Sequence, residues 1–291
     1  MASAGGSVDR YRRGFVINVA LTGAVADFRK NPNVPVTTAA IVDQARQSYA
    51  AGAAIAHFHV RDEEGKPSCE PQRFAAVFEQ LRADDTTRGL VLCATTSGRH
   101  GQTIDQRAAV LQLPLDIRPD MASLTLGSLN FVTGASINDH DTVRRLCEKM
   151  LEAGVKPEIE VFDLGMIAFM HQLIHEGLLA APFYVNVLLG NLSSAQVDPA
   201  HFGLINSYLP DQATVAIAGL GRYQLQANIL GLAVADGARV GLEDNLWFDD
   251  RRTPATNPGL VSRLAEMASL AQRPLTTSVE LRQRLGLRAR N

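Results

Sequence analysis

The sequence contains few cysteines, few aromatic residues and no excess of charge of either sign. Of 291 residues, three are cysteine, 6% are aromatic, and the formal net charge is −2. Cys69, Cys93 and Cys147 are odd in number and show no CxxC spacing, so we expect reduced thiols. The near-neutral charge, without a basic tract interleaved with aromatic residues, argues against nucleic acid or an anionic membrane as a partner.

Long apolar runs are also missing. No uninterrupted apolar stretch is long enough to span a bilayer. The first 14 residues, MASAGGSVDRYRRG, are polar and basic and lack the apolar segment of a secretory signal, so residues 1–14 are expected to be a flexible leader. We therefore expect a cytoplasmic protein that does not act on a membrane.

What the chain does have is a regular alternation of short apolar runs with helical patterns. The runs are continuous rather than alternating in polarity, as in parallel strands that are covered on both faces. The predicted strands are Phe15–Leu21, Ala53–Val60, Gly89–Ala94, Asp120–Leu124, Glu158–Phe162, Phe183–Leu189, Thr214–Ala218 and Ala238–Leu242.

The helices between these runs have readable ends. Thr37 or Thr38 is a suitable N-cap for a helix that closes at Gly52, and Pro71 opens the next one. Pro199 and Pro258 open two later helices. A C-terminal helix over Ser278–Leu287 lies outside the repeated units.

Eight strand–helix units without a break in composition predict a single-domain α/β fold, the (β/α)8 TIM barrel, over residues 15–291 with an extra C-terminal helix. The competing fold is an open doubly wound sheet. Such a sheet usually carries a Gly-rich phosphate turn after its first strand, whereas this chain continues as VALTGAVADF. The pattern therefore favours the barrel.

Two histidines end the second predicted strand, in the segment Ala56–Asp62 (AHFHVRD). Residues i and i+2 of a strand face the same side, so His57 and His59 project together, about 6–7 Å apart at Cα. Both imidazoles can then reach one ion at about 2.0–2.1 Å, the usual zinc–nitrogen distance. The alternative is an ordinary buried histidine with an accidental neighbour, but two desolvated imidazoles in an apolar run favour a shared metal.

A charged cluster, Arg239–Asn245 (RVGLEDN), ends the eighth predicted strand. Arg239, Gly241 and Glu243 are expected to share a face, with Asp244 where the strand gives way to its loop. In a closed barrel this strand lies next to the first, which lies next to the second, so Glu243 can complete a His57, His59 and Glu243 zinc site with an open position. The alternative is an ion pair that only stabilises the barrel rim.

Other polar residues also follow strands. Glu158 and Glu160 share one face of the fifth strand, and if that face is inward Arg239 is their natural partner. Thr95–Gly98 and Ser123–Thr125 offer hydroxyls to a small anionic or carbonyl ligand, although such residues are usually only turn formers. Gly219–Arg222 is a weak candidate for a phosphate site formed by backbone N–H groups and Arg222.

The chain resembles the β-keto acid cleavage enzyme family, whose founding activity is the cleavage of 3-keto-5-aminohexanoate. The resemblance covers roughly Val16 to Leu287 and is carried most specifically by AHFHVRDEEG and RVGLEDN. Further matching segments are LTGA, NPNVPVT, SLTLGSLNF, KPEIEVFDLGM and AGLGRYQ.

The resemblance implies a metal-dependent barrel that uses acetyl-CoA as co-substrate, converts a 3-keto acid to its acyl-CoA and releases acetoacetate. It also implies a homo-oligomer, namely a tetramer. By position, the Zn²⁺ ligands fall on His57, His59 and Glu243. The general base falls on Asp244, supported by Arg239 and Glu160, and the contacts to the keto acid fall on Thr95, Gly98 and Ser123.

One residue departs from the founding pattern. Val25 stands directly after TGA, where the founding enzymes carry an acid that meets the substrate's ammonium group. An apolar side chain cannot neutralise a cation, so we expect an uncharged or apolar 3-keto acid rather than the aminated one. Asp27, Arg29 or Lys30 on the same loop could also reach the substrate tail.

Three other functions compete with this interpretation. An amidohydrolase-type hydrolase also uses HxH in a barrel, but it needs that motif on the first strand and further histidines after the fifth and sixth strands, which read EIEVFD and FYVNVLLG. A metal-dependent aldolase or lyase without CoA exchange is harder to separate on residues alone. A barrel that only binds a metal would show zinc without turnover.

Overall fold

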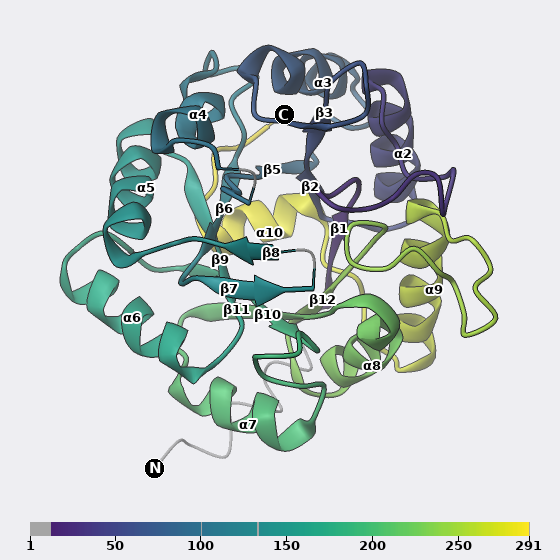
Figure 1. Cartoon of the computed structure of the whole chain (residues 1–291). Helices are drawn as coiled ribbons and strands as arrows, with labels where there is room; N and C mark the ends of the chain where they lie inside the picture. The colour runs from purple at the N-terminus through teal and green to yellow at the C-terminus, as the bar shows by residue number, and fades with distance from the viewer. Residues whose placement is uncertain (1–12, 100, 133, 291) are drawn as a thin grey trace.

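The computed structural model describes residues 13–99, 101–132 and 134–290 and shows a closed barrel of eight parallel strands within a ring of helices (Figure 1). The predicted single-domain (β/α)8 fold is confirmed. Neighbouring barrel strands follow the order β1-β12-β11-β10-β9-β6-β5-β2, so the first and last strands pair and close the sheet. The barrel strands are β1 Val16–Ala20, β2 Ile55–Phe58, β5 Val91–Ala94, β6 Met121–Thr125, β9 Lys156–Val161, β10 Phe183–Leu189, β11 Ala213–Gly219 and β12 Gly237–Val240.

The surrounding helices begin and end largely where the sequence signals place them. Thr37 is the N-cap of α2, since its side chain accepts from the Ala40 N–H. Proline opens α3, α7 and α9. The helices are α2 Thr38–Ala50, α3 Pro71–Ala83, α4 Ile104–Ala108, α5 His140–Ala153, α6 Leu164–His175, α7 Pro199–Tyr208, α8 Gln224–Val234, α9 Asn257–Leu270 and α10 Ser278–Leu285, with short 3-10 turns η1 Ala109–Gln112 and η2 Gly221–Tyr223.

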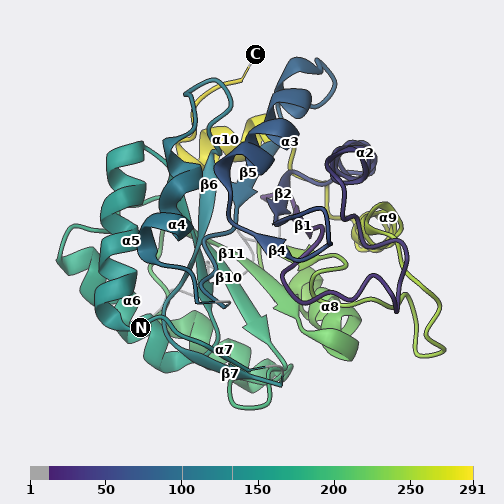
Figure 2. The same cartoon turned by 45° about the horizontal axis from the view of Figure 1, so that its top comes forward.

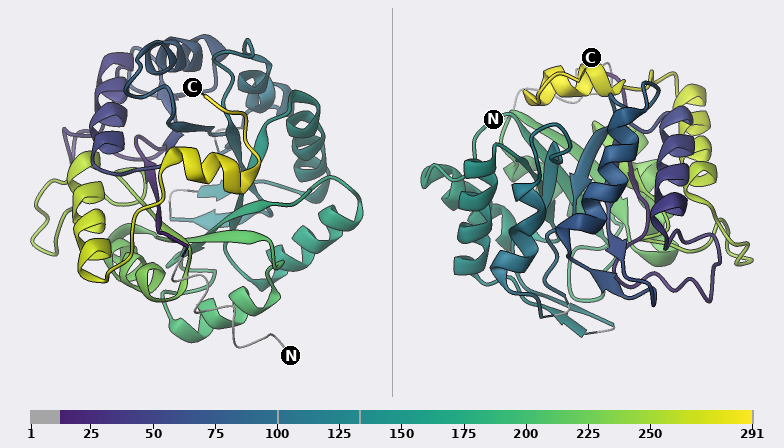
Figure 3. Two further views of the ribbon diagram at one scale, coloured as in Figure 1. Left: turned by 180° about the vertical axis from the view of Figure 1, so that it is seen from behind. Right: turned by 90° about the horizontal axis from the view of Figure 1, so that it is seen from above.

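The hydrophobic core has two parts. The larger part lies between the strands and the helix ring, where Phe58 of β2 packs edge-on against Phe78 of α3 with ring centroids 5.2 Å apart. The smaller part fills the N-terminal end of the barrel interior with apolar side chains of the strands, including Ile55 and Met121. Leu281 and Leu285 of α10 pack into this second part, so α10 closes that end of the barrel (Figure 3).

The opposite end of the barrel carries two short hairpins that the sequence did not predict. One pairs β3 (Val60–Arg61) with β4 (Pro67–Ser68), and the other pairs β7 (Leu129–Phe131) with β8 (Gly134–Ser136). The β7–β8 hairpin lies across the mouth, at the end of the molecule away from α10 (Figure 2). The C-terminal ends of the barrel strands therefore open beneath the hairpin.

Two strand boundaries differ from the prediction at places that matter for the site. Strand β2 ends at Phe58, so His59 follows the strand rather than belonging to it. Strand β12 ends at Val240 because Gly241 has φ +144° and a Cβ there would lie 2.1 Å from the Ala20 carbonyl oxygen. The expected alternation of Arg239, Gly241 and Glu243 along one strand face is therefore wrong, and a turn places Glu243 instead.

Within the described residues all three cysteines are free thiols, and no helix is long and apolar enough to cross a membrane. Residues 1–12 of the expected leader lie outside the described residues. Of the remaining two, Gly14 precedes Phe15, whose N–H donates to the Pro274 carbonyl at 2.7 Å.

Candidate active site

Polar side chains occupy the barrel interior above the apolar layer. Asn18 of β1, Glu158 of β9 and Asn186 of β10 are all fully buried, and Arg239 of β12 is 1% exposed. They face the axis because the register brings these inward positions to the same level, with Asn18 opposite Arg239 and Asn186 opposite Glu160. The interior therefore changes from apolar to charged toward the C-terminal ends of the strands.

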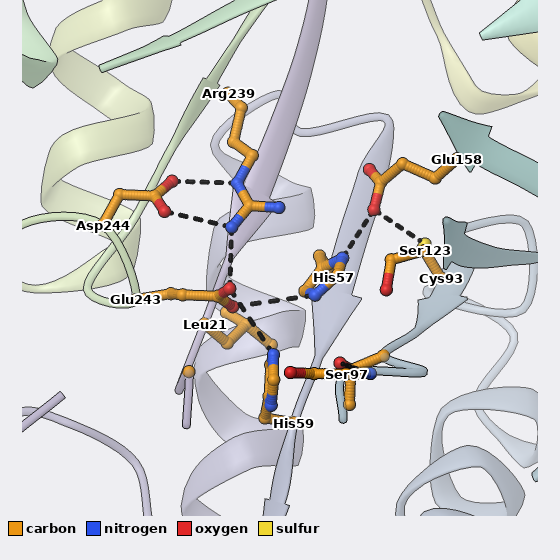
Figure 4. A network of polar contacts seen from close by, with 12 residues as sticks. Leu21, His57, His59, Cys93, Ser97, Ser123, Glu158, Arg239, Glu243 and Asp244 are labelled. Carbon is orange, nitrogen blue, oxygen red and sulfur yellow. Dashed lines mark hydrogen bonds and ion pairs between the residues drawn. The ribbon is translucent and has the colours of Figure 1, made fainter. Parts of the chain in front are cut away.

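His57, His59 and Glu243 converge at this end, as the sequence predicted. The Nε2 atoms of His57 and His59 lie 3.7 Å and 3.5 Å from the Glu243 carboxylate oxygens, and the two imidazole centroids are 5.4 Å apart (Figure 4). One donor atom of each residue lies within 4.8 Å of the other two. This is the arrangement of a three-ligand site with an open fourth position.

A tight turn holds Glu243 in place. The Glu243 N–H donates to the Ala20 carbonyl at 3.2 Å, and the Asp244 and Asn245 N–H groups donate to the Gly241 carbonyl at 3.2 and 3.1 Å. Gly23 lies against Glu243, since a Cβ there would approach the Glu243 Cγ to 2.7 Å. The loops after β1 and β12 therefore fix this carboxylate together.

Glu158 orients His57 from the other side of its ring. The His57 Nδ1 lies 2.6 Å from the Glu158 Oε2, and the thiol of Cys93 donates to the same oxygen at 3.1 Å. Asn18 and Asn186 donate to the Glu158 Oε1 at 2.6 and 2.7 Å. The ionised carboxylate can only accept, so Nδ1 of His57 carries a hydrogen and Nε2 is the ring nitrogen that faces Glu243.

Arg239 connects three carboxylates at the barrel mouth. It donates to both oxygens of Asp244 at 2.8 and 3.0 Å and to Glu243 at 2.7 Å. A longer bond of 3.3 Å reaches Glu160, whose other oxygen accepts from Thr125 at 2.6 Å. The Arg239 guanidinium therefore fixes the carboxylates of Glu243, Asp244 and Glu160 relative to one another.

Burial and neighbouring charges set the protonation of these groups. Burial opposes a charged His57, but Glu243 and Glu158 outweigh it and raise the pKa of His57 to about 8. Burial lowers the pKa of His59 despite Glu243. Burial opposes ionisation of Glu243 too, yet Arg239 and both histidines hold its pKa well below the ordinary value. Burial raises the pKa of Asp244, against the opposing effect of Arg239, so its ionised form is a stronger base than a free aspartate.

The donor set fits a divalent ion such as zinc. Two imidazole nitrogens and one carboxylate oxygen are borderline ligands that Zn²⁺ accepts readily. The Glu243 Oε2 is buried and has no hydrogen-bond partner, although buried carboxylate oxygens are normally bonded. A cation among the three side chains would satisfy that oxygen.

The site opens into a cavity of about 530 Å³ beneath the β7–β8 hairpin. Thr95 and Ser123 line it, and the oxygen of each hydroxyl accepts from a backbone N–H, from Ser97 and Thr96 respectively, both at 3.1 Å. Because these oxygens already accept, each hydroxyl hydrogen is available to an anionic ligand. The other lining residues considered below are Val25, Arg99, Phe131, Glu160, Arg222 and Asp244.

Two predicted substrate contacts differ in their setting. Val25 lines the cavity from the loop after β1 and is 43% exposed. Gly98 is not among the residues that line the cavity, and a Cβ there would approach the Arg107 Nη1 to 2.7 Å. The glycine is therefore required by the close approach of Arg107, whether or not it contacts substrate.

The weak candidate for a backbone phosphate site at Gly219–Arg222 has two of its N–H groups bonded within the fold. The Leu220 N–H donates to the Leu189 carbonyl, the Gly221 N–H to the Asp244 carbonyl at 2.7 Å, and the Tyr223 N–H to the Leu220 carbonyl. These groups are therefore not available to a phosphate. The side chain of Arg222 lies over the Tyr223 ring at the cavity rim.

The sequence indicated His57, His59 and Glu243 but not the side chains that hold them in position. It left the direction of Glu158 open and gave no role to Asn18, Asn186 or Arg99. The available signal was a polar residue in the middle of an apolar strand, which is costly to bury unless it is bonded. That signal alone does not say which partner it meets.

Comparisons with known proteins place the chain in a family. The sequence profile of the beta-keto acid cleavage enzyme family matches residues 15–287. The chain is 34% identical over 274 residues to the 3-keto-5-aminohexanoate cleavage enzyme of Fusobacterium nucleatum, covering 94% of this chain and 98% of that enzyme. It is 36% identical to the 3-oxoadipate:acetyl-CoA acetyltransferase of Cupriavidus necator, with 94% of each chain covered. The chain belongs to the beta-keto acid cleavage enzyme family.

A solved structure agrees with this fold. ObcA in complex with a C4-CoA adduct and oxalate superposes with a TM-score of 0.76 at 21% identity, over 88% of this chain and 68% of ObcA. At that identity the likeness supports the barrel alone.

Proposed function

We propose that this protein is a zinc-dependent beta-keto acid cleavage enzyme that converts a 3-keto acid and acetyl-CoA to an acyl-CoA and acetoacetate. The observation that carries the proposal is the convergence of His57, His59 and Glu243 beside the Arg239–Asp244 pair, 2.8 Å apart. The Fusobacterium nucleatum and Cupriavidus necator relatives are named for a beta-keto acid cleavage and for an acetyl-CoA acetyltransferase, which supports the same reaction class.

Each side chain has a role in this reaction. His57, His59 and Glu243 would hold the Zn²⁺ ion, which when bound would supply the positive charge that acidifies C2 of a 3-keto acid. Thr95 and Ser123 donate their hydroxyl hydrogens to the substrate carboxylate. Val25 offers no counter-charge to an ammonium group, so the substrate is a 3-keto acid other than 3-keto-5-aminohexanoate.

Asp244 removes the C2 proton. Arg239 holds both of its oxygens, so the carboxylate keeps a fixed direction toward the cavity, and burial makes it more basic. The substrate carbanion then attacks the thioester carbonyl of acetyl-CoA and expels the CoA thiolate. The thiolate adds to the original ketone, and cleavage of the C2–C3 bond leaves the acyl-CoA and the carbanion of acetoacetate. That carbanion takes back the proton held by Asp244 and is released as acetoacetate. Glu160, bonded to Arg239 and Thr125, positions Arg239 during these steps.

The role of Asp244 is tested by Asp244→Asn, which keeps the shape but removes the base. We expect the variant to bind zinc at full occupancy and to lose about 10²–10⁴-fold in turnover. Metal analysis and an acetoacetate assay measure the two effects. Asp211→Asn, which changes an exposed carboxylate at the opposite end of β11, serves as the matched control. Near-normal turnover in Asp244→Asn would contradict the assignment of Asp244 as the general base.

Omitting acetyl-CoA separates this reaction from a metal-dependent aldolase, lyase or hydrolase. A panel of 3-keto acids is incubated with the zinc-loaded protein, with and without acetyl-CoA, and acetoacetate and acyl-CoA are followed. The proposed reaction forms both products only when acetyl-CoA is present. Cleavage without acetyl-CoA would favour the rival chemistry, and zinc binding without any turnover would favour a binding protein.

A further inference from the structure

Arg99, on the loop after β5, is a cation in the cavity wall without an anionic partner. Its guanidinium makes no hydrogen bond or ion pair with a side chain in the described residues, and its Nε is buried without a partner. The guanidinium carbon lies 3.9 Å from the centroid of the Phe131 ring. Phe131 belongs to β7, so the hairpin at the barrel mouth holds this cation from one face.

The other cavity arginines are already occupied. Arg239 is bonded to three carboxylates, and Arg107 donates to the Thr96 carbonyl and to Asn138, both at 2.6 Å. Arg222 is an exposed side chain at the rim, stacked on Tyr223. Arg99 is therefore the arginine among the described lining residues that is partly buried, faces the cavity and lacks a polar partner for its guanidinium.

A partly buried cation in this position needs a counter-charge. Burial opposes the charged form of Arg99, and the carboxylates of Glu243, Glu160 and Asp244 favour it only from a distance, since none is within ion-pair range. Those three carboxylates are bound by Arg239, and a zinc ion would occupy Glu243 further. A ligand that brings its own anion would give the guanidinium the bidentate partner it lacks.

We propose that Arg99 binds a second carboxylate at the far end of the substrate, so that the enzyme prefers 3-keto dicarboxylic acids. The inference rests on the proposed function. In the proposed reaction the hydroxyls of Thr95 and Ser123 serve the carboxylate next to the reacting carbon. Arg99 instead contacts Phe131 of the β7–β8 hairpin across the barrel mouth, and we assign that side of the cavity to the substrate tail. Val25 alone suggests an uncharged tail, and Arg99 changes that expectation to an anionic one.

The test compares two substrates that differ only at the tail, the six-carbon 3-keto acid with a terminal carboxylate and the one with a terminal methyl. We expect the native enzyme to prefer the dicarboxylate by about 10- to 100-fold in kcat/KM, mainly through KM. In Arg99→Met the preference disappears, because kcat/KM for the dicarboxylate falls by that factor. The kcat/KM for the substrate with the terminal methyl changes little. Arg99→Lys keeps the charge without the planar fork and should retain part of the preference.

Arg145→Met is the matched control, since Arg145 is an exposed arginine on α5 that does not line the cavity. It should keep the full preference. Equal use of the two acids by the native enzyme, or an equal loss with both in Arg99→Met, would overturn the inference. So would loss of the preference in Arg145→Met.

A binding measurement separates this inference from the proposed reaction. Adipate and hexanoate match the two substrates but lack the ketone, and calorimetric titration of the zinc-loaded protein reports their affinities without turnover. If neither keto acid is cleaved, the proposed function fails. In that case tighter binding of adipate that Arg99→Met abolishes still supports the anion site, and equal binding of both overturns it.

Discussion

At the scale of single residues, the proposed metal ligands depend on partners that lie deeper in the barrel. Glu158 fixes His57 through a 2.6 Å contact to Nδ1, and two asparagines and a thiol complete the bonding of its oxygens. A carboxylate in this position makes the imidazole a better and better-oriented ligand. Glu158 is thus a positioning residue that acts through His57.

Glu158→Gln tests this arrangement. The amide keeps the size of the side chain, but its NH2 group cannot accept a hydrogen bond as the second carboxylate oxygen does. His57 therefore loses its fixed orientation. We expect the zinc dissociation constant to rise about 10- to 100-fold, measured by competition with a chelating dye. Glu152→Gln, on the exposed face of α5, is the control and should leave the zinc dissociation constant unchanged. An unaltered zinc affinity in Glu158→Gln would contradict the positioning role.

At the scale of elements, α10 closes the N-terminal end of the barrel (Figure 3). Leu281 and Leu285 are fully buried against Val16, Ile55 and Met121 of the strands. The helix is bounded by a capping box at Thr277 and by Gly286 in the left-handed conformation, so it runs from Ser278 to Leu285. Because the site lies at the other end, α10 affects stability rather than chemistry.

Leu281→Ala tests the contribution of this helix. Removing the buried side chain loses apolar burial and leaves a cavity, so we expect the free energy of unfolding to fall by about 2–5 kcal/mol. Chemical denaturation measures the change, and the turnover number of the folded protein should stay the same. Val279→Ala, where the side chain is 56% exposed, should change stability by less than about 0.5 kcal/mol. Equal effects of the two substitutions would contradict the role of α10.

A buried ion cluster also joins α10 to the strands. The Asp120 carboxylate, just before β6, accepts from Arg82 of α3 at 2.6 Å and from two nitrogens of Arg282 at 2.9 and 2.7 Å. The Leu92 N–H donates to the same carboxylate at 2.9 Å. Burial alone would raise the pKa of Asp120, but these cations and hydrogen bonds outweigh it and lower the pKa below the ordinary value.

Asp120→Asn gives this cluster a measurable pH dependence. Because the folded-state pKa is lowered, the carboxylate contributes stability above its unfolded-state pKa of about 3.9 and loses it as the pH falls toward the folded-state pKa. At neutral pH we expect the substitution to cost about 3–5 kcal/mol, since Arg82 and Arg282 stay buried without their counter-charge. In urea unfolding, the difference in free energy of unfolding between the native protein and Asp120→Asn should shrink below about pH 4. A difference that does not depend on pH would contradict the role of the ionised Asp120.

At the scale of the whole molecule, the proposed metal site joins an early and a late part of the chain. Its ligands are His57 of β2, His59 directly after β2 and Glu243 in the turn after β12, and β2 and β12 both pair with β1. An ion bound by all three side chains stabilises the folded barrel and has no equivalent site in the unfolded chain. Metal binding should therefore be coupled to global stability.

Chelation of the metal tests that coupling. We expect zinc at about 100 times its dissociation constant to stabilise the native protein by about 2.7 kcal/mol, seen as a rise in Tm that EDTA reverses. His59→Ala should show almost no zinc-dependent rise. His171→Ala, on the partly exposed surface of α6, should keep the full rise. A Tm that does not respond to zinc in the native protein would argue against the site.

Local sequence determined much of this protein. Continuous apolar runs and capping residues such as Thr37 and Pro71 predicted the barrel, because strand and helix periods depend on neighbouring residues alone. The HxH pair and the Glu243–Asp244 pair also lay in the right segments, since the carboxyl ends of barrel strands meet at one face.

Only the tertiary structure decided which partner each buried charge meets. It showed that Gly241, at φ +144°, ends β12 early, that Glu158 turns inward to His57, and that Phe131 covers Arg99. These contacts join residues far apart in the chain, for example 101 positions between His57 and Glu158. Their energies depend on burial and on distance in space, and neither quantity is encoded in the spacing of residues along the sequence.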